Sequence, residues 1–135
     1  MALLVDTGAV YALADADDAW HHRVRDFLTS KGEMLLVPVT VLPEITYLLE
    51  RRLGSAVERR FVASLVAGEL FVEPLETADL GRIAEVLERY PQIGFVDASV
   101  VAMAERLGAA GVVTTDRRHF SMVRPRHRDA FELWP

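Results

Sequence analysis

Residues 3–10 read LLVDTGAV, and this stretch sets the fold class. Residues 2–5 are apolar and predict a short buried strand that ends at Asp6. Helical sequence follows directly, from about residue 8 to residue 30, with a break near the polar run DADD. Strands that alternate with helices in this way indicate a parallel sheet with helices on both faces.

The same alternation continues to the end of the chain. Gly32 is placed to end the first helical region, and Thr40 is placed to cap a later helix whose first turn contains Pro43. The further strands that we expect are residues 34–38, 70–74, 111–115 and a segment near FEL (131–133), and the further helices are residues 40–54, 55–67, 78–90 and 97–108. We therefore expect one domain over residues 1–135, a three-layer α/β/α domain with a central parallel sheet.

Composition agrees with one globular domain and excludes several classes of protein. The chain has 135 residues, of which 51% are hydrophobic and 26% charged, enough to bury a core. No apolar stretch approaches the roughly 18 residues of a membrane span, and the first residues lack a basic signal region, so we expect a cytoplasmic protein. The absence of cysteine excludes disulfides, thiolate zinc sites and thiol nucleophiles.

The charge distribution is uneven. The formal net charge is -5, whereas a protein that only coats nucleic acid is usually basic. Every basic residue except Lys31 is arginine, which reflects either codon bias or the fit of the guanidinium fork to phosphate. Arginines are dense late in the chain, where Arg117 and Arg118 are candidate contacts for a polyanion. This pattern fits an enzyme that handles a polyanion and keeps its own carboxylates in a cluster.

Four carboxylates are expected at one edge of the sheet. Asp6 ends the first strand and Asp116 ends the strand in VVTTD, and both strands are apolar enough to be central neighbours. Glu44 lies in the first turn of the helix after the second strand, and Asp97 lies at the start of a later helix. In open parallel sheets, function collects at the carboxyl ends of the strands.

Each of these acids also has a purely structural explanation. Asp97 is a good N-cap, Glu44 suits the helix dipole, and Asp6 and Asp116 suit turns. The four together are harder to explain in this way, because two carboxylates about 4 Å apart repel by roughly 4 kcal/mol at an effective dielectric constant near 20. A divalent cation such as Mg²⁺ or Mn²⁺ compensates such a cluster, and it can activate water and stabilise charge on a phosphodiester.

Other chemistries fit less well. The triplet Asp6-Thr7-Gly8 is also found in aspartic proteases, but those proteins are all-β, and this sequence predicts at least five helices. A phosphatase of the D-x-D type needs a second aspartate where this chain has Gly8. No H-E-x-x-H motif, P-loop or G-x-S-x-G motif occurs; His119 and His127 could contact phosphate or act as a base, but we interpret them as surface residues. A catalytically silent binding module and another Mg²⁺-dependent phosphohydrolase remain as alternatives.

The sequence resembles the PIN-domain ribonucleases, and specifically the toxins of VapBC-type toxin–antitoxin pairs. The resemblance covers nearly the whole chain and rests on four segments in order: LLVDTGAVYAL, VPVTVLPEITYLL, FVDASVVAMAERLG and GVVTTDRRHF. It implies a PIN-like fold and a Mg²⁺- or Mn²⁺-dependent endoribonuclease that cleaves single-stranded or looped RNA with a metal-activated water.

The resemblance also implies roles for individual residues and partners. Asp6, Glu44, Asp97 and Asp116 would be the catalytic metal ligands, with auxiliary hydroxyls from Thr7 and Thr115. Arg117 and Arg118 then become candidate RNA contacts. The implied partners are a second copy of the chain, in a homodimer, and a VapB-like antitoxin whose tail fills the acidic groove.

Overall fold

Five parallel strands form the central sheet within residues 2–135, the part of the chain that this computed structural model describes. The strands are β1 (Ala2–Val5), β2 (Met34–Pro38), β3 (Phe71–Glu73), β4 (Gly111–Val113) and β5 (Glu132–Trp134). Their order across the sheet is β3-β2-β1-β4-β5. β1 pairs with β4 through Leu4–Val112 and Val5–Val113, which confirms that the two apolar strands are central neighbours.

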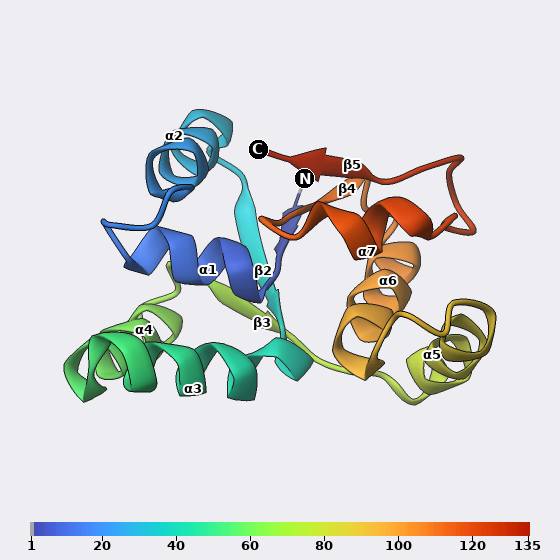
Figure 1. The fold of residues 1–135 in the computed structure, drawn as a ribbon, viewed down its shortest axis with the longest axis horizontal. Helices are drawn as coiled ribbons and strands as arrows, with labels where there is room; N and C mark the ends of the chain where they lie inside the picture. The colour runs from blue at the N-terminus through green and yellow to red at the C-terminus, as the bar shows by residue number, and fades with distance from the viewer. Residues whose placement is uncertain (1) are drawn as a thin grey trace.

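Helices cover both faces of this sheet, as predicted for a three-layer α/β/α domain. Figure 1 shows α1 to α4 on one side of the strands and α5 to α7 on the other. The helices are α1 (Thr7–Ala14), α2 (His21–Lys31), α3 (Leu42–Leu53), α4 (Ser55–Val66), α5 (Thr77–Arg89), α6 (Phe95–Leu107) and α7 (Arg117–Met122), and a 3₁₀ turn (Val39–Val41) precedes α3. No helix within residues 2–135 is both long enough and apolar enough to cross a membrane.

The order of the strands places a crevice between β1 and β4. The chain first moves outward from β1 through β2 to β3, and then returns to add β4 and β5 on the other side of β1. Connections therefore leave β1 and β4 toward opposite faces of the sheet. Such a reversal point, at the carboxyl ends of the strands, is where open α/β sheets bind their ligands.

Burial explains why β1, β4 and the middle of α6 are apolar. Leu3, Leu4 and Val5 of β1 and all three residues of β4 are buried, because helices cover both faces of the sheet there. The run from Ala98 to Ala104 in α6 is also buried throughout. Asp6, Asp97 and Asp116 are therefore carried by elements that are packed firmly in the core.

Two predicted helix caps are wrong. Thr40 does not cap α3, because it lies in the 3₁₀ turn, where its hydroxyl pairs with the buried Ser99 hydroxyl at 2.6 Å. Asp97 does not cap α6, because this helix begins two residues earlier, at Phe95, with Gly94 as its N-cap. The structural explanation of Asp97 as a cap is therefore removed. The helix α7 was not predicted.

Candidate metal centre

The four predicted acids meet around one cavity at the carboxyl ends of β1 and β4. The cavity has a volume of about 220 Å³. Its walls are Asp6, Thr7, Gly8, Val41, Glu44, Val96, Asp97 and Asp116. The acids arrive from four different elements, since Asp6 follows β1, Glu44 begins α3, Asp97 begins α6 and Asp116 follows β4.

Asp6 is the most buried of the four acids, with 6% of its surface exposed. It is also the N-cap of α1, since its Oδ1 accepts a hydrogen bond from the Ala9 N–H at 3.1 Å. Its Oδ2 accepts a hydrogen bond from the Thr114 hydroxyl. Burial raises the pKa of the Asp6 carboxyl to about 7; the two hydrogen bonds oppose this rise, and the charges of Asp97 and Asp116 add to it. An ionised Asp6 is therefore costly without a nearby cation.

Asp97 lies in the first turn of α6 and is contacted by a histidine. The Nδ1 atom of His119 is 2.8 Å from Asp97 Oδ2 and 3.6 Å from Asp116 Oδ2. Burial raises the pKa of the Asp97 carboxyl, His119 opposes the rise, and Asp116 and Glu44 reinforce it. Ligand atoms of Asp97, Asp116 and His119 all lie within 4.8 Å of one another. The cluster thus has the size of a single cation site.

Glu44 and Asp116 form the open side of the cavity. Both are exposed. Glu44 lies in the first turn of α3, and Asp116 caps α7 by accepting a hydrogen bond from the Arg118 N–H at 3.2 Å. Structural explanations therefore hold for Asp6 and Asp116, which are both caps, although the capping atoms are only one oxygen of each carboxylate. Of the second oxygens, Asp6 Oδ2 accepts from the Thr114 hydroxyl and Asp116 Oδ2 lies 3.6 Å from His119 Nδ1.

Small residues near Asp6 control the space at the bottom of the cavity. The Thr7 hydroxyl is buried and has no hydrogen-bond partner within residues 2–135. A side chain at Gly8 would place its Cβ only 2.2 Å from Thr115 Oγ1, so any larger residue at this position would displace the Thr115 side chain. The hydroxyl that contacts Asp6 belongs to Thr114, whereas Thr115 lies beside Gly8; the auxiliary roles expected of Thr7 and Thr115 stay predictions.

These residues fit a hard divalent cation. Carboxylate and hydroxyl oxygens are the ligands that Mg²⁺ and Mn²⁺ prefer. The unpartnered Thr7 hydroxyl is a polar group that burial leaves unsatisfied, and a bound ion with its water would satisfy it. No arginine or lysine is among the residues that line the cavity. Asp6, Glu44, Asp97 and Asp116 could hold such an ion.

The two arginines predicted to contact RNA lie beside the cavity, at the start of α7. Both are exposed. The Arg117 guanidinium donates to the Pro135 carbonyl and lies 5.6 Å from the centre of the Trp20 ring, which fixes its direction. An Arg118 guanidinium nitrogen lies 3.5 Å from His119 Nε2. Arg118 is therefore the one whose charge is close to the metal centre.

Sequence reasoning missed two residues of the site, His119 and Thr114. His119 was interpreted as a surface residue, yet it lies three residues after Asp116 on α7 and so shares a helix face with it. Recognising α7 would have revealed this spacing. Nothing in the local sequence distinguishes Thr114 from Thr115, because the choice depends on which side chain of the strand end points toward β1.

Comparisons with known proteins agree with this geometry. The PIN domain family profile matches residues 3–124. Ribonuclease VapC26 of Mycobacterium tuberculosis is 30% identical over 98% of this chain and 100% of its own length.

Two solved structures share the fold. One is Mycobacterium tuberculosis VapC20, a Sarcin-Ricin loop cleaving toxin, with a TM-score of 0.78, 27% identity, and 85% of this chain and 90% of that chain covered. The other is VapBC2 of Rickettsia felis, solved with a DNA fragment from its promoter, with a TM-score of 0.73, 15% identity and both chains covered in full. The profile match and the similarity to VapC26 cover almost the whole chain, and we conclude that the protein belongs to the PIN-domain family, among the VapC-type ribonucleases.

Proposed function

We propose that this VapC-type ribonuclease is the toxin of a toxin–antitoxin pair, and that it cleaves RNA at the acidic cavity with Mg²⁺ or Mn²⁺ held by Asp6, Glu44, Asp97 and Asp116. The observation that carries the proposal is the convergence of four carboxylates on one cavity that no arginine or lysine lines. Burial raises the pKa of Asp6 to about 7, so the site is electrostatically strained without a cation. Perturbed acids in a cavity are typical of functional sites.

The side chains divide the work between holding the ion and placing the RNA. The ion supplies an activated water and stabilises negative charge on the scissile phosphodiester. Thr114 and the Ala9 N–H fix the two oxygens of Asp6, and His119 fixes one oxygen of Asp97, so that the carboxylates are oriented before the ion binds. Arg118, next to His119, is placed to contact a phosphate of the substrate.

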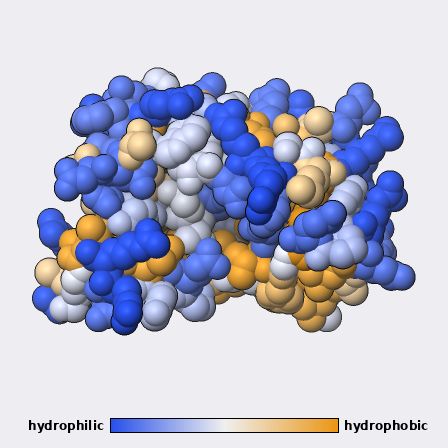
Figure 2. Space-filling model, in the orientation of Figure 1, coloured by the Kyte–Doolittle hydropathy of each residue, from blue (hydrophilic) through white to orange (hydrophobic). Residues whose placement is uncertain are grey.

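The partners are proposed from the family and from the surface. The comparison with VapBC2 supports a VapB-like antitoxin as the partner of this toxin, and we infer that the tail of the antitoxin covers the acidic cavity. Figure 2 shows hydrophobic residues along the lower edge of one face, over α3–α4 and over α5–α6. Val66 on α4 is 85% exposed and Leu80 on α5 is 46% exposed. Such patches suit contacts with an antitoxin or with a second copy in a homodimer. Because RNA is the substrate, we place the activity in the cytoplasm.

Cleavage should require the metal, and this is the test of the proposal. Purified protein is incubated with a mixed RNA pool in Mg²⁺, in Mn²⁺ and in excess EDTA, with an Asp97→Asn variant prepared in parallel to expose any contaminating nuclease. We expect cleavage by the parent protein in Mg²⁺ or Mn²⁺, none in EDTA and none by the variant. Equal cleavage in EDTA would exclude the metal mechanism, and the absence of cleavage in every condition would favour a silent binding module.

A further inference from the structure

A second charged cavity lies away from the metal centre, between α5 and the segment after α7. Its volume is about 390 Å³. We call it the arginine pocket, and its charged and aromatic walls are Arg82, Glu85, Arg89, Tyr90, Arg124 and Arg126. Four arginines face one carboxylate, so the walls carry a formal charge of +3 in a chain whose net charge is -5. This contrast calls for a physical explanation.

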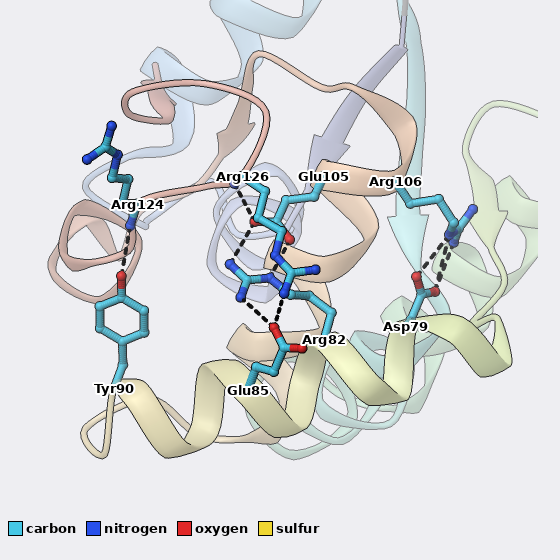
Figure 3. Close-up of polar contacts among 8 residues, drawn as sticks. All are labelled: Asp79, Arg82, Glu85, Tyr90, Glu105, Arg106, Arg124 and Arg126. Atoms are coloured by element: carbon cyan, nitrogen blue, oxygen red, sulfur yellow. Dashed lines mark hydrogen bonds and ion pairs between the residues drawn. The ribbon is translucent and has the colours of Figure 1, made fainter.

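Ion pairs within the protein account for only half of these arginines. Arg82 is only 15% exposed and binds Glu105 through its Nε at 2.7 Å, while Arg126 binds Glu85 with its side chain and Glu105 with its backbone N–H. These contacts, drawn in Figure 3, build the floor of the pocket. If Glu105 is counted with the walls, the local charge is still +2.

Arg89 and Arg124 are left over. Within residues 2–135, no carboxylate lies at ion-pair distance from Arg89, whose guanidinium lies 5.7 Å from the centre of the Tyr90 ring. Arg124 has only Asp129, at 3.6 Å, and because both side chains are largely exposed this pair stabilises the fold very little. In Figure 3 the Arg124 guanidinium points away from the network. Two arginine side chains are therefore available to an external anion.

The pocket is joined to the metal centre through both of its walls. Arg89 and Tyr90 end α5, and a short loop leads from them to α6, which carries Asp97. Arg124 follows α7, whose N-cap is Asp116; a helix of six residues is about 9 Å long. The Arg124 N–H donates a hydrogen bond to the Tyr90 hydroxyl at 3.2 Å, which joins the two walls. The pocket is thus held in a fixed position relative to the acids.

We propose that the arginine pocket binds a backbone phosphate of the RNA substrate, away from the phosphodiester that is cleaved. This proposal rests on the proposed function, because it assigns a second contact to the same RNA. A strand with one phosphate at the cation carries further phosphates on either side, and an acidic cavity repels them unless positive charge lies along their path. Arg89 and Arg124 supply that charge as planar forks that match phosphate oxygens. Such contacts position the strand without reading its bases.

The test compares two double variants with equal loss of charge. Arg89→Ala/Arg124→Ala removes the two available arginines of the pocket. Arg25→Ala/Lys31→Ala removes two positive charges from α2, which Figure 1 shows at the opposite corner of the molecule from α5. The probe is a fluorescently labelled uridine oligonucleotide of about 20 residues, long enough to reach both sites. Binding is measured over a range of salt concentrations in EDTA, where cleavage stops if the proposed function is correct.

We expect the pocket variant to bind the oligonucleotide several-fold more weakly than the parent protein. Its plot of log affinity against log salt should become shallower by about 0.7, since the loss of one phosphate contact on a single strand removes about that much from the slope. The α2 variant should match the parent protein. Calorimetric titration with Mn²⁺ should give the same affinity for all three proteins, which shows that the metal centre is intact.

Three outcomes would overturn the proposal. One is an unchanged salt slope in the pocket variant with normal Mn²⁺ binding, which would leave the metal-centre function standing. Another is that an acidic peptide, polyglutamate, binds the parent protein but not the pocket variant, while both proteins bind the RNA equally. The pocket would then serve a protein partner. A parent protein that binds neither RNA nor Mn²⁺ would remove the proposed function and the pocket's role together.

Discussion

The acidic cavity and the ion-pair network between α5 and α6 both contain buried carboxylates. The two regions differ in what balances the negative charge of these carboxylates. In the network, Asp79 is 3% exposed and faces Arg106, whose Nε lies 3.0 Å from Asp79 Oδ1. Burial opposes ionisation of Asp79, yet the Arg106 hydrogen bonds and the Glu76 N–H hold its pKa below the usual value. In the cavity, Asp6 is almost as buried and has no such partner, and its pKa rises to about 7.

The difference separates acids that serve folding from acids that serve a ligand. An ionised carboxylate beside an arginine is already compensated when the chain folds. The carboxylates of the cavity repel one another in the folded protein and are compensated only when a cation binds. The protein therefore gives up some stability at one end of the sheet and keeps matched charges elsewhere. The first of the following predictions tests the compensated acid of the network, and the others test the acids of the cavity.

Removal of the arginine partner should have the largest effect. Arg106→Ala leaves Asp79 buried without its counter-charge, so we expect a loss of about 3–5 kcal/mol in the free energy of unfolding. Urea denaturation measures the loss. The control is Arg25→Ala, because Arg25 pairs with Asp26 at the surface and this exposed pair should contribute no more than about 1 kcal/mol. Equal losses in the two variants would show that Asp79 does not depend on Arg106 for its compensation.

The pH dependence of stability should reveal the unmatched Asp6. Its pKa is about 7 in the folded protein, whereas the ordinary value for an aspartate is 3.8, so the folded state holds this proton more tightly. The resulting stabilisation is complete below about pH 4 and is lost as the pH rises through about 7, a change on the order of 4 kcal/mol. The Asp6→Asn variant, which can still cap α1, should lack this component.

Urea denaturation of both proteins in EDTA from pH 4 to pH 8 tests this expectation. The unfolding free energy of the parent protein, relative to that of Asp6→Asn, should fall across the range. Added Mn²⁺ should reduce the fall, because the ionised carboxylate is the form that binds a cation. Parallel curves in EDTA would show that Asp6 ionises normally and that the cavity is not strained.

Asp97→Asn should impair function without impairing folding. Because Gly94 caps α6, Asp97 has no capping role, and Asn can still accept the hydrogen bond from His119. In EDTA the variant should be at least as stable as the parent protein, since one repelling charge is gone. It should gain less stability from Mn²⁺, and cleavage should fall by at least about 100-fold.

The matched control for this variant is Asp26→Asn, an equal change of charge at an exposed position on α2. Thermal melts with and without Mn²⁺ are compared with RNA cleavage for the two variants and the parent protein. A fully active Asp97→Asn protein would remove Asp97 from the metal centre and would contradict the four-acid site.

Local signals explain why much of the fold could be predicted from the sequence. Aliphatic runs predict β1 and β4 from a few adjacent residues each. The end of α2 is predicted by Gly32, which has a φ of 59°, a conformation that glycine adopts readily. Two apolar strands that end in aspartate were therefore placed together correctly. The convergence of Asp6, Glu44, Asp97 and Asp116 followed from that placement, because the carboxyl ends of parallel strands share one edge.

The features that were missed depend on tertiary placement. The helix α7 has six residues, too few for a hydrophobic period to emerge from the arginine-rich sequence. Thr40 does not form the expected cap because its hydroxyl is hydrogen-bonded to Ser99, which is 59 positions away. The contact between His119 and Asp97 spans 22 positions and exists only because α7 packs beside the start of α6. No local propensity contains this information.

His119 offers the finest test of the comparison, because it is the one basic side chain that contacts the acids of the cavity within residues 2–135. If it acts by orienting Asp97, His119→Ala should weaken Mn²⁺ binding by about tenfold, the lower end of the range for residues that support a metal ligand. His119→Asn should retain most of the affinity, since its amide can donate a hydrogen bond from nearly the position of Nδ1. Calorimetric titration with Mn²⁺ measures both variants. Unchanged affinity in His119→Ala would show that Asp97 needs no support, whereas an equal loss in both variants would indicate that His119 itself binds the ion.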